Sequence, residues 1–452
     1  MMGQLVGQQD RLFYEFNLEE RVPADHLLRR INSVLDLSWL RGELKPYYSH
    51  TGCPSVDPEL MVRMLLVGYC YSVRSERRLC QDVELNLAYR WFCRLGLEDK
   101  VPNHSTFSVN RHGRFRDAGV LRQVFESVVC QCMEAGLVGG EGFAIDASVI
   151  EANASRFQRV EGAEIDWSEE QLARHAIKEY IAALETENSP LNPDTLPKAL
   201  SPSDPMAAWT TRGRYKVMFG YSLNYLIDME STVIVDVEAT PTRISKEVDA
   251  AETMLQRTEE RFALKPERIA GDVAYGTAEM LGWLVGHDID PHIPVWDRTE
   301  VAARGRFVRD DFTYDKERDV YTCPNGKLLK TSGRVDKGTT LKYLAKRSDC
   351  AQCPLKPQYT TGQERRVGRD VNQEARDYTR ALMETEAYRQ SAIDRKQIER
   401  LFGEAKSHLS MTRLRLRGLT GARDEFLLTA TVQNLKRLVE RLAIPPPRAV
   451  AA

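Results

Sequence analysis

The sequence predicts an α/β protein in which a mixed sheet forms the core and an all-helical segment precedes it. Up to about Leu137, apolar residues recur at helical spacing between polar turns. From Gly142 onward, short apolar runs alternate with amphipathic stretches, which indicates strands and helices that share one sheet. The chain has 452 residues, more than one hydrophobic core usually serves, so two or three domains are expected.

The composition is that of a globular chain, with 42% hydrophobic and 28% charged residues. A formal net charge of -2 lacks the basic excess common in nucleic-acid-binding proteins, so DNA binding would depend on local clusters of Lys and Arg. Residues 1–16 contain no apolar stretch of a signal peptide, and no apolar run reaches the roughly 18 residues of a membrane helix. Nine scattered cysteines then predict a reducing cytoplasm.

An all-helical domain is expected over residues 1–137. Its clearest helix starts at Asp57, an N-cap acid followed by proline. Ser75 opens a second helix, and a third carries Arg111 and Arg114. Short helices with arginines on the later ones fit a helix-turn-helix-like DNA-binding domain, and a helical bundle with a solvated basic face explains them equally well. The residues expected in the core are Trp91, Phe92, Leu95 and Leu97.

The sheet is expected within residues 138–299, with 391–443 completing the core. Its first strand ends in an acid and is followed by an insertion, about 156–210, with a helix and a link rich in Pro, Ser and Asn over 188–205. The expected strands are 143–146, 221–227, 232–237, 268–272 and 292–295, with amphipathic helices over 248–262 and after Thr277. A hairpin meander followed by alternating helices and strands is the order of an RNase H-like fold.

Residues 300–390 interrupt this order. Short β-like pieces surround Cys323, and Cys350 and Cys353 follow, which predicts a β-rich insertion with a Cys motif. The remaining expected segments are a helix from Asp394 past Lys406, an amphipathic helix over 426–442 and a disordered tail over 444–452.

Two acids end predicted strands, Asp146 and Asp272, and each has an alanine two residues before it. Phosphodiester chemistry with two Mg²⁺ ions needs carboxylates from separate elements that converge at one edge of a sheet. A single acid at a strand end is more often a cap or a solvated edge residue, so the hypothesis depends on finding two in this topology. Gly271 and Gly276 are expected to let a ligand backbone approach closely.

Glu399 is the candidate for a third carboxylate. At about 100° per residue, Arg395, Glu399 and Lys406 lie within about 40° of one another on one helical face. Glu404 lies on the opposite side. The alternative is an i,i+4 ion pair on a solvated helix, worth only about 0.2–0.5 kcal/mol. The core-facing stripe of this helix is Ile398, Leu401, Phe402, Ala405 and Leu409.

Residues 395–406 resemble the Y-(2)-R-(3)-E-(6)-K signature of IS-four-like insertion-sequence transposases, with the R-(3)-E-(6)-K part intact. The signature's tyrosine position holds Ala392, and Tyr388 lies one turn earlier. Further segments resemble the IS-eleven-eighty-two-type branch of that superfamily, namely 57–116, 145–148, 151–155, 271–276, 398–403 and 415–419.

The resemblance implies that Asp146, Asp272 and Glu399 form a catalytic triad that binds two Mg²⁺ or Mn²⁺ ions. Arg395 and Lys406 would hold the phosphates of transposon ends. The implied activity is binding to terminal inverted repeats, followed by DNA cleavage and strand transfer. The implied partners are double-stranded DNA, as transposon ends and target, and a second copy of the chain in the synaptic complex. The implied location is the bacterial cytoplasm, in association with the nucleoid.

Further DNA-binding candidates are basic residues that follow the triad, Arg413, Arg415 and Arg417, because such clusters provide phosphate affinity without a basic chain overall. Two other classes of function compete with the transposase. An RNase H-like nuclease would hydrolyse DNA without joining strands, and an inactive derivative would only bind it. The intact triad argues against the second. Trp296 could stack on a flipped base, although a tryptophan packed against the sheet is the commoner arrangement.

The Cys motif supplies three thiolates, Cys323, Cys350 and Cys353, whereas a structural zinc ion has four ligands. Relatives tend to have a further cysteine where this chain has Gln358, and no histidine lies between Cys323 and Glu399. We expect a metal-free remnant. The alternative is a three-Cys zinc site completed from elsewhere in the chain.

Overall fold

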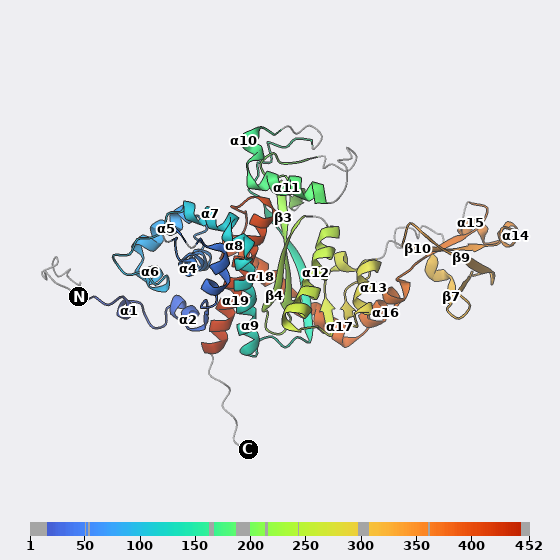
Figure 1. Ribbon diagram of the computed structural model, residues 1–452. Coiled ribbons are helices and arrows are strands. Elements are labelled where there is room, and N and C mark those ends of the chain that lie inside the picture. The colour runs from blue at the N-terminus through green and yellow to red at the C-terminus, as the bar shows by residue number, and fades with distance from the viewer. Residues whose placement is uncertain are drawn as a thin grey trace, which may run out of the picture. The chain divides into compact units, whose positions relative to one another are not determined.

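The computed structural model in Figure 1 describes residues 16–49, 51–52, 55–161, 167–186, 199–212, 216–242, 244–296, 307–359 and 362–443. The chain divides into two compact units: unit 1 comprises 1–137, 149–221 and 401–452, and unit 2 comprises 138–148 and 222–400. The predicted tail 444–452 and most of the link 188–205 lie outside the described residues. None of the described helices is both long and apolar enough to cross a membrane.

The N-terminal part of unit 1 is helical, as predicted. Asp57 caps the fourth helix by accepting a hydrogen bond from the Glu59 N–H, and the fifth helix starts after Ser75. The predicted third helix is divided in two, because the backbone at Gly113 leaves the helical region (φ -121°, ψ -115°). The helices are α1 (Leu18–Arg21), α2 (Leu27–Val34), α3 (Leu40–Leu44), α4 (Pro58–Cys70), α5 (Glu76–Leu85), α6 (Leu87–Phe92), α7 (Ser105–His112), α8 (Arg114–Asp117) and α9 (Val120–Glu134).

The core of these helices is completed from the far end of the chain. The last helix, α19 (Gly418–Ala443), packs against α2, α4 and α9 and buries Phe426 and Leu435 (Figure 1). Phe92 and Leu95 are buried as expected. The expectation for Leu97 is wrong, because its side chain is 51% exposed.

The rest of unit 1 contains the predicted insertion helix, which forms as α10 (Glu169–Leu172) and α11 (His175–Thr186). A strand that the sequence analysis did not predict, β2 (Ala208–Arg212), pairs antiparallel with the first residues of β3 (Lys216–Asp228). The register joins Ala208 to Gly220 and Thr210 to Met218. The strand that follows the insertion therefore starts earlier than the 221–227 expected from the apolar pattern.

His175 at the start of α11 joins three helices of unit 1. The Arg116 guanidinium of α8 donates a hydrogen bond to its Nδ1 (3.0 Å), and its Nε2 lies 3.0 Å from the Thr420 hydroxyl of α19. Burial, followed by the charge of Arg116, lowers the pKa of His175 to about 4. The ring of His112, with its centroid 4.7 Å away, and the charge of Lys178 act in the same direction.

Unit 2 contains the mixed sheet, and its strand order is β4–β3–β1–β5–β6. The strands are β1 (Gly142–Glu151), the second half of β3, β4 (Ile234–Pro241), β5 (Arg268–Ala270) and β6 (Asp290–His292). β1, β5 and β6 run parallel. β3 is antiparallel to β1, because the Met229 N–H donates to the Gly142 carbonyl at one end and the Ala152 N–H donates to the Phe219 carbonyl at the other. The last strand ends at His292, whereas 292–295 was predicted.

Helices and a buried apolar cluster support this sheet in unit 2. α12 (Ile244–Phe262) packs against β4, and α13 (Ala278–Gly286) packs against β6 and α16 (Gln373–Met383). Thr277 caps α13 as predicted, since its side chain accepts a hydrogen bond from the Met280 N–H. The cluster beneath the helices includes Phe143, Ile145, Val235, Met254, Ile269, Leu281 and Ile293.

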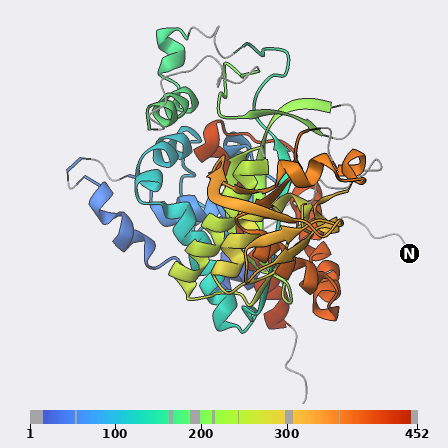
Figure 2. The ribbon, with the colours of Figure 1, turned by 90° about the vertical axis from the view of Figure 1, so that its right-hand side faces the viewer.

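A second sheet of five antiparallel strands lies within the predicted β-rich insertion, and Figure 2 shows it in orange. Its strand order is β11–β10–β9–β8–β7, and its own small core includes Phe312, Tyr321, Leu329 and Tyr343. The elements are β7 (Thr313–Asp315), β8 (Val320–Thr322), β9 (Leu328–Asp336), β10 (Thr340–Ala345), α14 (Arg347–Ala351), α15 (Lys356–Tyr359) and β11 (Arg366–Asp370).

Gly276 permits a close approach within the chain itself. A Cβ atom at this position would lie 1.9 Å from the Pro294 carbonyl oxygen, and the Trp296 N–H donates a hydrogen bond to the Gly276 carbonyl (2.8 Å). The segment after β6 therefore fills the space expected for a ligand backbone.

We predict that Gly276→Ala lowers the free energy of unfolding by about 3 kcal/mol, because backbone atoms on both sides of the clash must shift. The matched control is Gly286→Ala at the end of α13, where nothing lies within 4 Å of the added methyl group. The control should be neutral or stabilising by up to about 1 kcal/mol. Denaturant titration measures both, and a Gly276→Ala protein as stable as the control would contradict the assignment.

We also predict that acid weakens unit 1 through His175. Folding lowers the pKa of this side chain from 6.5 to about 4, so between these values the folded chain binds fewer protons than the unfolded chain. The contribution to stability is complete above pH 6.5 and is lost as the pH falls toward 4. His175→Gln should flatten this part of the pH–stability curve, whereas the exposed control His408→Gln should leave it unchanged.

Candidate active site and nucleic-acid interface

Asp146 and Asp272 reach the same edge of the sheet in unit 2. β1 and β5 are parallel neighbours in which Ala144 pairs with Ala270, and each acid comes two residues after its alanine. Adjacent strands are about 4.8 Å apart, so two side chains at equivalent positions lie close together. The two aspartates therefore lie on or beside neighbouring strands. The expectation that Asp146 ends its strand is wrong, because β1 continues to Glu151, whereas Asp272 lies two residues past the end of β5.

One oxygen of each aspartate is held by the backbone. Oδ1 of Asp146 accepts a hydrogen bond from the Ala147 N–H (2.8 Å). Oδ1 of Asp272 accepts one from the Ala274 N–H (2.8 Å) and caps a 3-10 turn, η3 (Val273–Tyr275). Oδ2 of Asp272 has no hydrogen-bond partner among the described residues. Each carboxylate is therefore oriented through one oxygen, and Asp272 keeps the other available.

Glu399 lies on α18 (Lys396–Ser407), the helix predicted from Asp394. The chain forms two helices here, α17 (Glu386–Asp394) and α18, because Arg395 is the C-cap of the first. Glu399 is exposed and has no hydrogen-bond or ion-pair partner within the described part of the chain. The expected core stripe is buried, with Ile398, Leu401, Phe402, Ala405 and Leu409 all at most 6% exposed.

The electrostatics of Asp146 link it to the other two acids. Burial raises the pKa of the Asp146 carboxyl to about 6, and the negative charges of Asp272 and Glu399 add to the effect. The Ala147 N–H and Arg395, whose Nη1 lies 3.4 Å from Oδ2, oppose it. Asp272 and Glu399 are thus both within electrostatic reach of Asp146, and Arg395 offsets part of the repulsion at Asp146.

The three candidates fit a divalent cation by charge and donor type, because carboxylate oxygens are the ligands that Mg²⁺ and Mn²⁺ prefer. Among the described residues, no three side chains of the His, Cys, Asp and Glu types are close enough together to hold one ion. Asp146 instead contacts Arg395.

Two buried features beside these acids were missed by the sequence analysis. The Tyr275 hydroxyl is buried without a hydrogen-bond partner in the described structure, and burial together with the charges of Asp146 and Glu247 raises its pKa. His292 at the end of β6 lies 2.7 Å, through Nδ1, from the Ser391 hydroxyl of α17. Nothing in the sequence pattern signals this second contact, which joins the helix before Glu399 to the sheet.

Of the predicted DNA-binding residues, the two arginines in the N-terminal helices, Arg111 and Arg114, both contact other side chains of the protein. Arg111 is buried and ion-paired with Glu76, so its charge is neutralised inside unit 1. Arg114 lies over the Tyr48 ring and donates to the Ser55 hydroxyl (3.0 Å). We therefore leave Arg111 out of the proposed DNA surface.

Other candidates remain accessible. Arg413, Arg415 and Arg417 are exposed on the segment before α19, and Arg417 Nε donates to the Asn153 carbonyl (3.0 Å). Lys406 is half-buried on α18. Glu404, the poorer candidate for the triad, is bonded to Gln433 and Arg437 of α19, which leaves it a structural role.

The Cys motif and Trp296 lie in unit 2. Cys323, Cys350 and Cys353 belong to one apolar cluster of the five-stranded sheet, and none forms a disulfide. The Lys327 N–H donates to the Cys323 sulfur (3.3 Å). Trp296 is 36% exposed, and Arg376 donates to its carbonyl (3.0 Å).

Comparison with known proteins finds two family matches. Residues 16–113 match a transposase domain family known as domain of unknown function 772, and residues 322–439 match the transposase DDE domain family. A chain of the cryo-EM structure of the piggyBac transposase synaptic complex with hairpin DNA is similar at 12% identity and a TM-score of 0.32, over 93% of this chain and 82% of that chain. No curated protein matches the sequence.

The matches at both ends of the chain define the class of this protein, which is a transposase. More particularly, it is an insertion-sequence transposase of the DDE type. Enzymes of the DDE family cut DNA and transfer strands, and they generally use divalent metal ions. The second match includes Glu399 and Lys406 and begins after Asp146 and Asp272.

Proposed function

We propose that this chain cuts the DNA at the ends of its insertion sequence and joins the released 3′ ends to target DNA, with Asp146, Asp272 and Glu399 as the catalytic triad. The observation that carries the proposal is the pairing of Ala144 with Ala270, which brings the two aspartates to one edge of the sheet. Burial is the main cause of the raised pKa of Asp146, and the smaller contributions of Asp272 and Glu399 support Glu399 as the third member.

The strand order supports an RNase H-like catalytic core. Two antiparallel strands, β3 and β4, lie on one side of β1, and the parallel strands β5 and β6 lie on the other. This is the order expected of that fold, with the first acid within its central strand and the second just after the next parallel strand. The core would bind Mg²⁺ or Mn²⁺ as two ions.

Each residue of the site has a separate part in this mechanism. Bound divalent ions activate the attacking oxygen and stabilise the leaving oxygen of an in-line displacement. The backbone N–H groups of Ala147 and Ala274 orient the two aspartates. Arg395 neutralises Asp146 in the resting protein and, once released, binds a phosphate of the transposon end with its planar guanidinium.

The remaining basic residues would bind the DNA on either side of the cut. Lys406, Arg413, Arg415 and Arg417 all follow Glu399 along the chain, and Arg114 lies in the helical region that would recognise the terminal inverted repeats. Because an element has two ends, we propose a homodimer in the synaptic complex. The motifs quoted above favour the IS-eleven-eighty-two-type branch.

The triad is tested by substitution. We predict that Asp146→Asn, Asp272→Asn and Glu399→Gln each reduce Mg²⁺-dependent cleavage at least about 100-fold, while DNA binding survives. The reason is that losing even a residue that only orients a metal ligand typically costs about 10–100-fold. Glu404→Gln on the same helix is the matched control and should cut at the wild-type rate. Robust cleavage by any one of the three variants would remove that residue from the site.

Strand transfer separates a transposase from a simple nuclease. We predict that the protein, given Mg²⁺, a labelled pre-cleaved end and supercoiled plasmid, joins the end covalently to the plasmid. The reason is that the same triad acts on a DNA 3′-OH as on water, provided that the end stays bound beside it. Gel mobility of the label measures joining. Nicking of uncleaved ends with no labelled plasmid, where binding of the end is demonstrated, would favour the nuclease.

A further inference from the structure

We propose that a cavity in unit 1 binds a backbone phosphate of DNA between Arg77 and Arg415. The proposal rests on the proposed function, because that function makes DNA the partner. It concerns unit 1 alone, however, and includes none of the triad. The cavity lies between the start of α5, the start of α7 and the segment that leads into α19.

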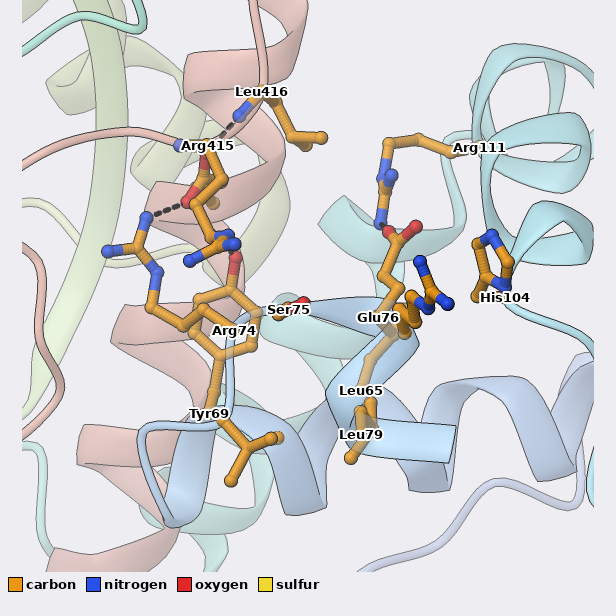
Figure 3. Close-up of a pocket in the computed structure, with 14 residues that line it drawn as sticks. Leu65, Tyr69, Arg74, Ser75, Glu76, Leu79, His104, Arg111, Arg415 and Leu416 are labelled. Atoms are coloured by element: carbon orange, nitrogen blue, oxygen red, sulfur yellow. Dashed lines mark hydrogen bonds and ion pairs between the residues drawn. The ribbon is translucent and has the colours of Figure 1, made fainter. Parts of the chain in front are cut away.

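The cavity has a volume of about 230 Å³. A water molecule occupies about 30 Å³, so the space holds a phosphate group together with water. Figure 3 shows Arg415 and Leu416 on one side and Glu76, Arg111 and His104 on the other. Ser75, which makes no capping hydrogen bond to α5, also lines it.

The charges that line the cavity do not balance. Four arginines and two glutamates contribute to the wall. Arg74 pairs with Glu425 and Arg111 pairs with Glu76, and both arginines are buried. Arg77 and Arg415 are exposed, and neither guanidinium has a hydrogen-bond or ion-pair partner among the described residues.

Two uncompensated guanidinium groups on facing elements favour an anion between them. A guanidinium group can donate two parallel hydrogen bonds to two oxygens of a phosphate. A chloride ion has no such pair of acceptors.

The backbone that carries Arg415 is fixed in place. The Glu425 carboxylate, 1% exposed on α19, accepts hydrogen bonds from the N–H groups of Arg415 and Leu416, both at 2.7 Å. Arg74 donates to the carbonyls of Ser410 (2.5 Å) and Arg413 (2.9 Å) in the same segment. Because this segment is already ordered, ligand binding at Arg415 costs less conformational entropy of the protein than binding on a mobile loop would.

A second cavity, of about 490 Å³, shares Arg74 and Arg415 with the first. Ser72, Asn153, Ser410, Thr412 and Arg413 line this second cavity, together with Leu414. Arg413 is about half exposed and lies 4.0 Å from Glu151. Arg77 and Arg415 therefore line one cavity, and Arg415 and Arg413 line its neighbour. Successive positive charges suit a linear polyanion such as a DNA strand better than a single free phosphate.

The test is the salt dependence of DNA binding by the full chain in EDTA, measured by fluorescence anisotropy on two duplexes of unrelated sequence. Each lost phosphate contact reduces the slope of log K against log salt by about 0.9. We expect Arg77→Gln and Arg415→Gln each to make the loss of affinity over a fourfold rise in salt about 3-fold smaller, equally on both duplexes. Arg415→Lys should keep most of the slope, because it keeps the charge.

The matched control is Arg78→Gln, one residue further along α5, where the guanidinium is bonded to Asp82 (2.6 Å) and 69% exposed. It should keep the wild-type slope. Unchanged slopes in correctly folded Arg77→Gln and Arg415→Gln proteins that still join ends to plasmid would overturn the cavity assignment. They would also remove Arg415 from the DNA-binding residues, and they would leave the proposed chemistry of the triad standing. If the two variants show reduced slopes but the wild-type protein never cuts DNA, the cavity assignment stands and the proposed function is overturned.

Inorganic phosphate serves as the second probe. If it raises the unfolding temperature of the wild type but not of the two variants, while the DNA slopes stay unchanged, the cavity takes free phosphate and the DNA assignment is overturned. If the variants lose both the stabilisation and the slope, the same cavity binds the phosphates of DNA, as we propose.

Discussion

The parallel pairing of β1 with β5 is the constraint on which the candidate site depends. Ala144 and Ala270 are both fully buried at the point where the strands pair, and each is followed two residues later by an acid. A shift of one residue in this register would turn one acid to the other face of the sheet. Burial at this position raises the pKa of Asp146, the like charge of Asp272 adds to the effect, and Arg395 offsets part of it.

Local chemistry explains what the sequence could predict. A few neighbouring residues determine each of three features: the cap at Asp57, the cap at Thr277 and the apolar stripe of α18. All three are present in the structure. The apolar runs before Asp146 and Asp272 are equally local signals, although β1 continues past Asp146 to Glu151 and β5 ends two residues before Asp272. What local signals do not give is the pairing itself: β2 was not predicted, and β6 ends before the predicted strand does.

The sequence alone does not show which arginines are ion-paired inside the protein and which remain available to bind a ligand. Arg111 was a DNA-binding candidate, but its partner Glu76 lies 35 residues away along the chain. Arg74 is neutralised by Glu425, 351 residues away, and only the folded chain brings them together. Burying an arginine requires such a partner, so the partners, rather than the arginines, decide which charges remain for a ligand. Gly276 shows the same limit, because the backbone that it accommodates belongs to a distant segment of this chain.

The position of α19 has a consequence for synthesis. Helices α2, α4 and α9 are made early, yet part of the apolar surface that covers them comes from residues 418–443. A ribosome adds about 5–20 residues per second, so the first helices leave it long before their core is complete. A product that stops short of Gly418 keeps that apolar surface exposed to chaperones and proteases. Shortened copies of the chain would therefore be more prone to degradation than copies that include residues 418–443.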